Sequence, residues 1–210
     1  MPKCPARSFH KRAQEHIPEA LRPALGPILE QIGSLTERIR QYDRKLEEIS
    51  KESYPETELL RQVEGIGPLT ALTFVLTLED PHRFERSRCV GAYLGLVPAM
   101  DQSGDRNPQK RISKEGLEML RKLLVGSAHY ILGPFGSDSD LRRHGEKIAS
   151  RGAKNSKKRA AVAVARKLSV LLHRARGLVG RSTSHYAIRI AQEARRRQLS
   201  KDAIEHNSDL

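Results

Sequence analysis

A serine beside a glycine lies in a polar, cation-rich stretch of the chain and has the chemistry of a nucleophile. Ser103 precedes Gly104, a pair that suits a tight, exposed turn, and Arg106, Lys110 and Arg111 follow closely. Such cations can bind a scissile phosphate and stabilise the charge that develops when a hydroxyl attacks phosphorus. We therefore predict Ser103 as the catalytic residue of a phosphodiester reaction. The alternative is an ordinary turn serine.

A second serine, Ser113, is the competing candidate for the nucleophile. It precedes an apolar, helix-like segment, so its position already has an explanation as a helix cap. We predict a helix from Lys114 to about Gly126, with Leu117 facing inward. Arg121 and Lys122 are then expected to face outward.

Metal-binding side chains are not clustered in the sequence. Cys4 and Cys89 are far apart, and the 8 histidines are scattered without a partner at ligand spacing. We therefore expect no cofactor on this chain alone, and Mg²⁺ only with ligands from another domain. The two cysteines fit a reducing cytoplasm. Apolar runs fall far short of the roughly 20 residues of a membrane span, so we expect no membrane partner.

Positive charge is concentrated in one part of the chain. Residues 106–176 hold 18 Lys and Arg against 5 Asp and Glu, an excess equal to the net charge of +13 of the whole chain. A surface of this kind indicates a polyanionic partner, DNA or RNA. The residues that we predict to bind nucleic acid are Gly65, Gly67, Arg106, Lys110, Arg111, Lys114, Arg121, Lys122, Lys158, Arg159 and Arg166.

Two glycines separate a pair of short apolar stripes. Leu59 to Val63 precede Gly65 and Gly67, and Ala71 to Val75 follow them at helical spacing. The pattern predicts a helix-hairpin-helix, in which glycines allow positive φ and the second helix directs its first amides at a phosphate. The alternative is a simple αα turn in which glycine ends a helix.

A longer periodic pattern precedes the hairpin. Apolar residues recur alternately three and four positions apart at Leu25, Ile28, Ile32, Leu35, Ile39, Tyr42, Leu46 and Ile49. This spacing predicts a coiled-coil arm over residues 21–54, joining copies of the chain through residues 25–49. The alternative is a long amphipathic helix packed on its own domain. Residues 1–20 lack periodicity, and we interpret them as a leader or a truncated remnant.

The composition favours a mainly α fold, because 30% of the residues are charged and only 4% are aromatic. We predict the coiled-coil arm and then a compact helical domain over residues 55–180, with the helix-hairpin-helix and the basic surface. A short helix is expected over residues 87–93 and a further helix over residues 158–174. Residues 181–210 are expected to form a C-terminal helix and tail.

Residues from about 59 to 179 resemble the C-terminal transposase domain of the IS116/IS110/IS902 insertion-sequence transposases, the bridge-RNA-guided recombinases. The motifs that carry the resemblance occur in order as Glu64-Gly-Ile-Gly67, Tyr93-Leu-Gly-Leu-Val-Pro98, Gln102-Ser-Gly104, Arg111-Ile-Ser-Lys-Glu-Gly116, Leu120-Arg121 with Leu123-Leu124, and Ala163-Val-Ala-Arg-Lys-Leu168. The resemblance implies that Ser103 is the nucleophile. It also implies DNA as substrate and a guide RNA as a further partner.

The same resemblance implies a coiled coil before this domain and, ahead of the coil, a RuvC-like domain with four metal-binding acidic residues. Only about twenty residues precede the arm here, so we expect a truncated transposase that needs this domain in trans. Three interpretations remain open. They are a serine-dependent transposase acting in DNA recombination, a non-catalytic nucleic-acid-binding and oligomerisation module, and a structural helix-hairpin-helix protein of the DNA-repair type.

Overall fold

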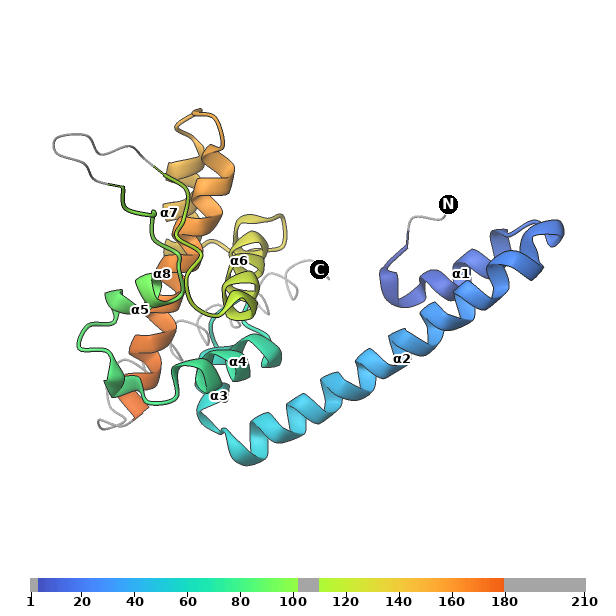
Figure 1. Cartoon of the computed structure of the whole chain (residues 1–210), viewed down its shortest axis with the longest axis horizontal. Helices are drawn as coiled ribbons and strands as arrows, with labels where there is room; N and C mark the ends of the chain where they lie inside the picture. Colours follow the sequence, from blue (N-terminus) through green and yellow to red (C-terminus); the bar gives the residue numbers. More distant parts are fainter. Residues whose placement is uncertain (1–3, 102–109, 180–210) are drawn as a thin grey trace, which may run out of the picture. The chain divides into compact units, whose positions relative to one another are not determined.

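The computed structural model describes residues 4–101 and 110–179, and it is mainly helical, as predicted (Figure 1). Within these residues, strand-like pairing is limited to one antiparallel bridge between Pro98 and Ile112. The chain divides into two compact units, Met1–Ile49 and Ser50–Leu210.

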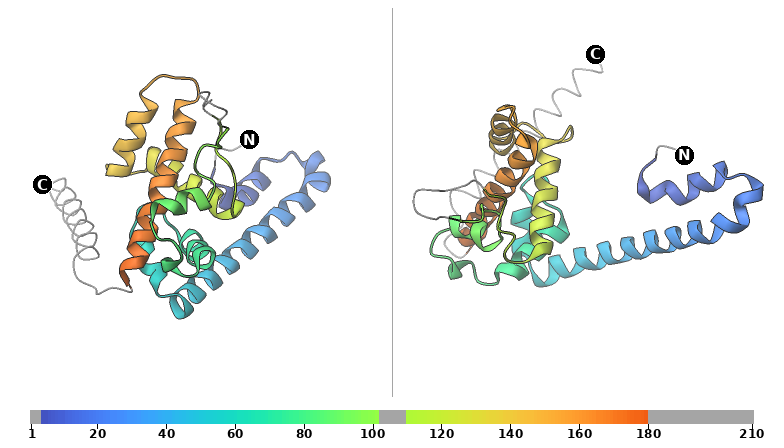
Figure 2. Two further views of the ribbon diagram at one scale, coloured as in Figure 1. Left: turned by 60° about the vertical axis from the view of Figure 1, so that its left-hand side comes forward. Right: turned by 45° about the horizontal axis from the view of Figure 1, so that its top comes forward.

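The first unit is a helical hairpin of α1 (Phe9–His16) and most of α2 (Arg22–Ser53), with short 3-10 turns η1 (Ala6–Ser8) and η2 (Glu19–Leu21). The two helices run side by side (Figure 2). Ala13 in α1 and Leu29 in α2 are buried. Gly33 permits this approach, because a Cβ there would lie 3.1 Å from the His10 ring. The lack of periodicity in residues 1–20 therefore did not exclude a helix.

The apolar stripe of α2 is largely exposed. The long helix that we predicted is confirmed, and it spans 32 residues. Five side chains of the stripe are between 45% and 65% exposed, and these are Ile28, Leu35, Ile39, Tyr42 and Ile49. The packing of α1 against α2 therefore leaves most of the apolar stripe exposed to solvent. Pairing with a second copy stays a prediction.

The second unit is organised around α8 (Ser156–Val179), which is contacted by α3 (Glu56–Arg61), α5 (Arg88–Tyr93), α6 (Glu118–Leu132) and α7 (Asp140–Ala149) (Figure 1). Next to them lie α4 (Pro68–Leu78) and the 3-10 turn η3 (Pro81–Arg83). Small residues of α8 such as Ala160, Val164 and Ala165 are buried. They allow the neighbouring helices to approach closely, which keeps the core compact with few aromatic side chains.

The boundaries of α6 and α8 differ from the sequence predictions. The helix expected from Lys114 begins at Glu118, and Leu117, which we expected to face inward, is half exposed at the cap position. The reason is a turn at Lys114 and Gly116, both at positive φ, which interrupts the helical pattern. The helices expected at 87–93 and 158–174 are confirmed, and the second is longer than predicted.

Helix α7 forms in a basic segment that contains a glycine. Ser139 caps it by accepting a hydrogen bond from the Arg142 amide. Gly145 then allows tight packing, because a Cβ there would lie 2.5 Å from Leu132 and 2.7 Å from Val164. Gly145 lowers the helix propensity of this segment, but the packing of α7 against α6 and α8 requires a glycine there.

A candidate nucleic-acid interface

A short antiparallel stem joins the two ends of the segment that contains the predicted nucleophile. The Ala99 amide donates to the Arg111 carbonyl at 2.8 Å, and the Ser113 amide donates to the Val97 carbonyl at 2.9 Å. Beyond the bridge, Lys110 forms an ion pair with Asp101. Ser103 and Arg106 themselves lie outside the described residues.

The base of the stem is a close backbone contact between two glycine turns. Gly95 has φ +64° and Gly116 has φ +74°. A Cβ on Gly116 would lie 2.1 Å from the Tyr93 carbonyl oxygen, and a Cβ on Gly95 would lie 2.4 Å from the Glu115 backbone. Only glycine satisfies both the backbone angle and the space at these positions. Two motif glycines thus have structural roles.

Arg121 is buried, which corrects the expectation that it faces outward. The side chain is 8% exposed. Its guanidinium donates to the Glu115 carbonyl at 2.7 Å and to the Leu94 carbonyl at 3.3 Å. The two glycine turns leave these carbonyls without helical partners, and Arg121, in the first turn of α6, lies within reach of both. It ties the turns together instead of presenting its charge to a phosphate.

Ser113 does not cap α6, which corrects a second expectation. Its amide belongs to the stem, and α6 begins beyond the turn that follows it. The Ser113 hydroxyl is buried and has no hydrogen-bond partner among the described residues. An enclosed hydroxyl cannot reach a phosphodiester, which argues against Ser113 as the nucleophile.

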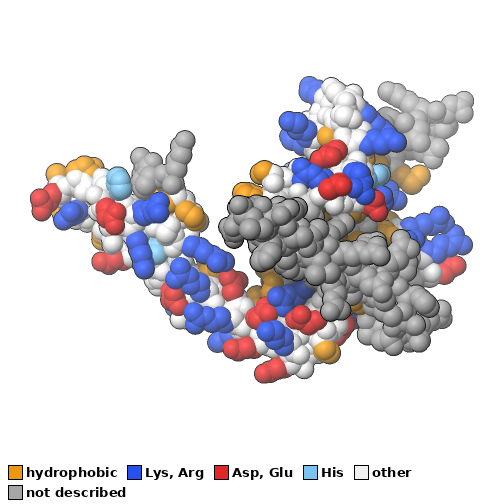
Figure 3. Space-filling view, turned by 180° about the vertical axis from the view of Figure 1, so that it is seen from behind, with side chains coloured by type: hydrophobic (Ala, Val, Ile, Leu, Met, Phe, Trp, Pro, Cys, Tyr) orange, Lys and Arg blue, Asp and Glu red, His pale blue; other side chains and the backbone are white. Residues whose placement is uncertain are grey.

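Seven of the predicted nucleic-acid-binding cations are exposed, namely Lys110, Arg111, Lys114, Lys122, Lys158, Arg159 and Arg166. The aliphatic part of Arg166 covers Gly91 in α5, where a Cβ would lie 2.8 Å from the Arg166 Cγ. Figure 3 shows Lys and Arg side chains around the end of the unit where α7 leads into α8, with some acidic side chains nearby.

Cations of the second unit shift the pKa of two neighbouring groups. Burial lowers the pKa of His144 in α7, and the charges of Lys167, Lys147 and Arg151 lower it further. The hydrogen bond from Lys122 lowers the pKa of the exposed Glu118 carboxyl.

The α3–α4 turn has one left-handed glycine and one extended glycine. Gly65 has φ +84°, whereas Gly67 has φ −89°, which corrects the expectation that both use positive φ. Glu64 anchors the turn, because its carboxylate accepts hydrogen bonds from the Ser137 amide at 2.9 Å and from the Ser137 hydroxyl. Two helices joined by a glycine turn are therefore present, and their identity as a helix-hairpin-helix stays a prediction.

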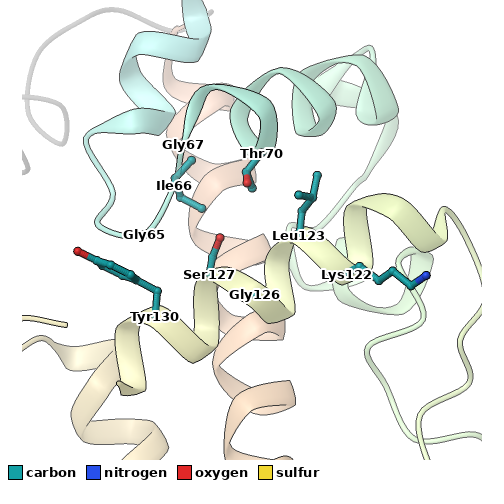
Figure 4. A pocket seen from close by; sticks show the side chains of 9 residues that line it. All are labelled: Gly65, Ile66, Gly67, Thr70, Lys122, Leu123, Gly126, Ser127 and Tyr130. Atoms are coloured by element: carbon teal, nitrogen blue, oxygen red, sulfur yellow. The ribbon is translucent and has the colours of Figure 1, made fainter. Parts of the chain in front are cut away.

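An open groove of about 530 Å³ lies between this turn and α6 (Figure 4). The turn side includes Gly65, Gly67 and Thr70, and the α6 side includes Lys122, Ser127 and Tyr130. Sequence reasoning found Lys122 and the two glycines but missed Thr70, Ser127 and Tyr130. The sequence did contain an indication of the α6 side of the groove, because residues 122, 126 and 130 are spaced four apart and therefore share one helix face.

Residues 57–137 match the sequence model of the Transposase IS116/IS110/IS902 family. This segment is therefore similar to the transposase domain of that family. The matched segment runs from α3 to the Ser137 loop, so it contains the α3–α4 turn, the stem and α6.

The chain is also similar to curated transposases. The transposase of insertion sequence element IS1111A from Coxiella burnetii is 36% identical over 46% of this chain, and that of element IS1328 from Yersinia enterocolitica is 34% identical over 55%. A probable family 20 transposase from Pseudomonas aeruginosa is 29% identical over 60%. The matched part of the chain spans only 26% to 37% of the lengths of these relatives.

The described residues offer no fit for a metal ion, because no three His, Cys, Asp or Glu side chains gather in residues 4–101 and 110–179. A Mg²⁺ site of the kind that the family resemblance implies is therefore not built from these residues. Within the same ranges, no helix is long and apolar enough to cross a membrane.

Proposed function

We propose that the transposase domain binds DNA and acts in DNA transposition through Ser103, whose hydroxyl attacks a phosphodiester. The observation that carries the proposal is the stem, which brings Asp101 and Lys110 together at the two ends of the segment containing Ser103. Arg111 is exposed in the stem, and Lys114 is exposed at its base. The family match of residues 57–137 supports the reaction class.

The reaction is a transesterification that needs no oxidant or reductant. The Ser103 Oγ forms a bond to phosphorus while the bond from phosphorus to one deoxyribose oxygen breaks. The serine loses its proton and the departing oxygen gains one, so the phosphoserine link conserves the bond energy for strand rejoining. Lys110, Arg111 and Lys114 would stabilise the negative charge on the phosphoryl oxygens in the transition state.

Complete transposition requires more than this domain in our proposal. We expect Mg²⁺ to be held by a RuvC-like domain, and a guide RNA to select the DNA target. Copies of the chain would associate through residues 25–49 of α2, where the apolar stripe is exposed. These expectations extend the proposal to the assembly and are tested separately from the nucleophile.

A protein-linked DNA adduct tests the nucleophile. The full chain, mixed with a RuvC-like domain of a relative, a guide RNA and Mg²⁺, is incubated with labelled DNA that is nicked so that rejoining fails. A denaturing gel should show labelled protein for the native chain and none for Ser103→Ala. Ser113→Ala is the matched control and should retain the adduct. An adduct that persists in Ser103→Ala would overturn the assignment.

A second candidate is a non-catalytic module that binds nucleic acid and oligomerises. It is favoured by the structural use of Arg121, Gly95 and Gly116, which shows that motif residues can be retained for folding alone. This candidate predicts DNA binding and self-association that are unchanged by Ser103→Ala, with no adduct under any condition. The same gel therefore separates the two functions.

A further inference from the structure

The pair of helices α7 and α8 carries positive charge with no opposing negative charge over much of its length. Residues 147–167 contain eight Lys and Arg and no Asp or Glu. All eight side chains are exposed, and none has a carboxylate partner among the described residues. The sequence alone predicts only three of them as nucleic-acid contacts. The α7–α8 surface consists of Lys147, Arg151, Lys154, Lys157, Lys158, Arg159, Arg166 and Lys167.

The packing of α7 on α8 brings cations of both helices together. A Cβ on Gly145 would lie 2.7 Å from Val164, so the two helices touch closely. Their connection over residues 150–155 is short, because Gly152 and Asn155 both adopt positive φ and turn the chain back. Figure 3 shows Lys and Arg side chains at this end of the unit. A partner placed here contacts cations of both helices at once.

Three of the cations lie in the first turn of α8, where they do not stabilise the helix. Acidic side chains are favourable at a helix N-terminus and basic ones are not. Helix α8 has no acidic residue in its first turn and has Lys157, Lys158 and Arg159 there. The nearest carboxylate in the sequence, that of Glu146, accepts from the Arg142 Nε at 2.8 Å. The charge is therefore balanced only by an anion from outside the described chain.

The anion that this pattern fits best is the backbone of a nucleic-acid duplex. A small anion neutralises one or two charges, whereas the phosphates of a duplex repeat along its length and match cations spread over two helices. Each neutralised phosphate releases counterions, which favours binding. Residues 147–167 contain no aromatic side chain on which an unpaired base would stack. The surface therefore suits the backbone of a duplex better than a single strand.

We propose that the α7–α8 surface binds the backbone of duplex DNA and holds the substrate, as a contact separate from the stem that carries the Ser103 segment. The inference rests on the proposed function, because it divides the DNA contact of that function between two parts of the fold. The surface lies beyond residues 57–137, so the family match does not assign it a role. The α7–α8 surface sets affinity, and the stem performs the chemistry. Backbone contacts of this kind position the duplex without reading its sequence.

The salt dependence of DNA affinity tests the surface. The full chain is titrated against a labelled duplex of mixed sequence, and binding is measured by fluorescence anisotropy at several salt concentrations. The triple variant Lys147→Gln, Arg151→Gln and Lys154→Gln removes three cations of the surface. Because each phosphate contact contributes about 0.9 to the slope of log affinity against log salt, the slope should become shallower by about 2.7. The affinity at about 0.1 M salt should fall about tenfold or more.

A control variant removes the same charge from α2. The changes Arg38→Gln, Arg44→Gln and Lys45→Gln are all at exposed positions of that helix. This variant has the same net charge as the first, so a general loss of positive charge affects both equally. Its slope should equal that of the native chain. Circular dichroism and the urea midpoint establish that both variants are folded.

His144 reports whether DNA lies on the surface. The ring is partly buried in α7, and burial lowers its pKa from 6.5, as do the charges of Lys167, Lys147 and Arg151. DNA phosphates that contact these cations offset their charge, so the pKa of His144 should rise in the complex. The complex then binds more protons than the free chain does. DNA affinity should therefore increase as pH falls from about 7.5 to about 5.5, roughly the range in which histidine titrates.

Two histidine variants separate this effect from other titrations. His144→Gln should weaken the increase in affinity at low pH. His16→Gln, at an exposed position of α1, should leave the increase as in the native chain. An increase of equal size in the native chain and in His144→Gln would overturn the assignment of the DNA contact to this surface.

The Ser103 adduct distinguishes holding of the substrate from chemistry. In the assembly with the RuvC-like domain, guide RNA and Mg²⁺, the triple variant of the α7–α8 surface should form less adduct than the native chain at limiting DNA. At saturating DNA it should form the same amount, because its stem is unchanged. A loss that saturating DNA does not restore would contradict a role confined to affinity.

The outcomes also separate the inference from the function on which it rests. If the native chain binds no DNA, the proposed function fails. If it binds DNA and the triple variant behaves like the α2 control, the function stands and the α7–α8 inference is wrong. If the salt and pH effects appear but no chain forms an adduct, the surface stands and the Ser103 chemistry fails. Loss of binding to an RNA duplex in the triple variant, with DNA binding retained, would overturn DNA as the occupant.

Discussion

The guanidinium of Arg121 donates to the carbonyl of Glu115 at 2.7 Å and thereby joins α6 to the turn at the base of the stem. The same group reaches the Leu94 carbonyl, so one side chain connects both turns. A cation that sequence reasoning assigns to nucleic acid is instead part of the fold. The stem and the residues at its base depend on it.

Replacement of Arg121 by methionine should therefore destabilise the fold. The change leaves two carbonyls unpaired, and we expect the free energy of unfolding to fall by about 2–4 kcal/mol, measured by urea denaturation. Lys122→Met is the matched control at an exposed position and should cost within about 0.5 kcal/mol. Equal stability of the two variants would mean that the Arg121 hydrogen bonds contribute nothing.

Alanine at Gly116 should be more damaging than alanine at a helical glycine. Gly116 has φ +74° and a Cβ would lie 2.1 Å from the Tyr93 carbonyl oxygen, so we expect a loss of about 2 kcal/mol or more. Gly126→Ala, with open space around it in α6, should instead stabilise the helix by about 0.5–1 kcal/mol. Thermal and urea unfolding of both variants measure the difference, and a tolerated Gly116→Ala would contradict the close contact.

His173 should make stability depend on pH. Burial lowers its pKa from the ordinary value of 6.5, and the neutral ring accepts from the Ser87 hydroxyl at 3.0 Å while its other nitrogen donates to the Pro81 carbonyl at 2.9 Å. The unfolded chain therefore binds a proton before the folded chain does, as pH falls below 6.5. Stability is fully present above this pH and decreases as pH falls toward the lowered pKa.

The variant His173→Gln removes this titration. The free energy of unfolding, measured from pH 7.5 down to pH 5 (roughly the range over which histidine titrates), should vary less steeply than in the native chain. An unchanged slope would show that His173 is not responsible.

The exposed stripe of α2 should mediate self-association. Leu35→Glu with Ile39→Glu places two carboxylates in the stripe, and sedimentation should then show a smaller species than the native chain. Ser34→Glu with Gln41→Glu adds the same charge at exposed positions outside the stripe and should leave association intact. A native chain that sediments as a monomer would remove the coiled-coil proposal.

Arg111 should contact a phosphate without reading sequence. With roughly 6 phosphate contacts, log affinity for DNA should fall with log salt at a slope near −5, and Arg111→Gln should reduce this slope by about 0.9. The loss should be equal for two unrelated sequences. Arg38→Gln, at an exposed position of α2, should not change the slope. A loss confined to one sequence would show that Arg111 contacts bases.

Local patterns were enough to predict much of this protein. The helical class, the long α2 and the helices near residues 88 and 156 follow from periodicity and from glycine and proline positions, because a helix is stabilised by contacts a few residues apart. The concentration of charge in residues 106–176 is likewise a property of the sequence. So are the ordered motifs that led to the transposase family.

Tertiary structure decided which motif residues support the fold and which face solvent. Arg121 is buried because two carbonyls from distant turns require donors, and Gly145 lies in a helix because α6 and α8 leave no space for a Cβ. The groove combines Thr70 from α4 with Ser127 from α6, residues far apart in the chain. Sequence periodicity indicates only which residues a few positions apart share a face of a helix or strand. No local pattern could therefore predict that these groups lie together.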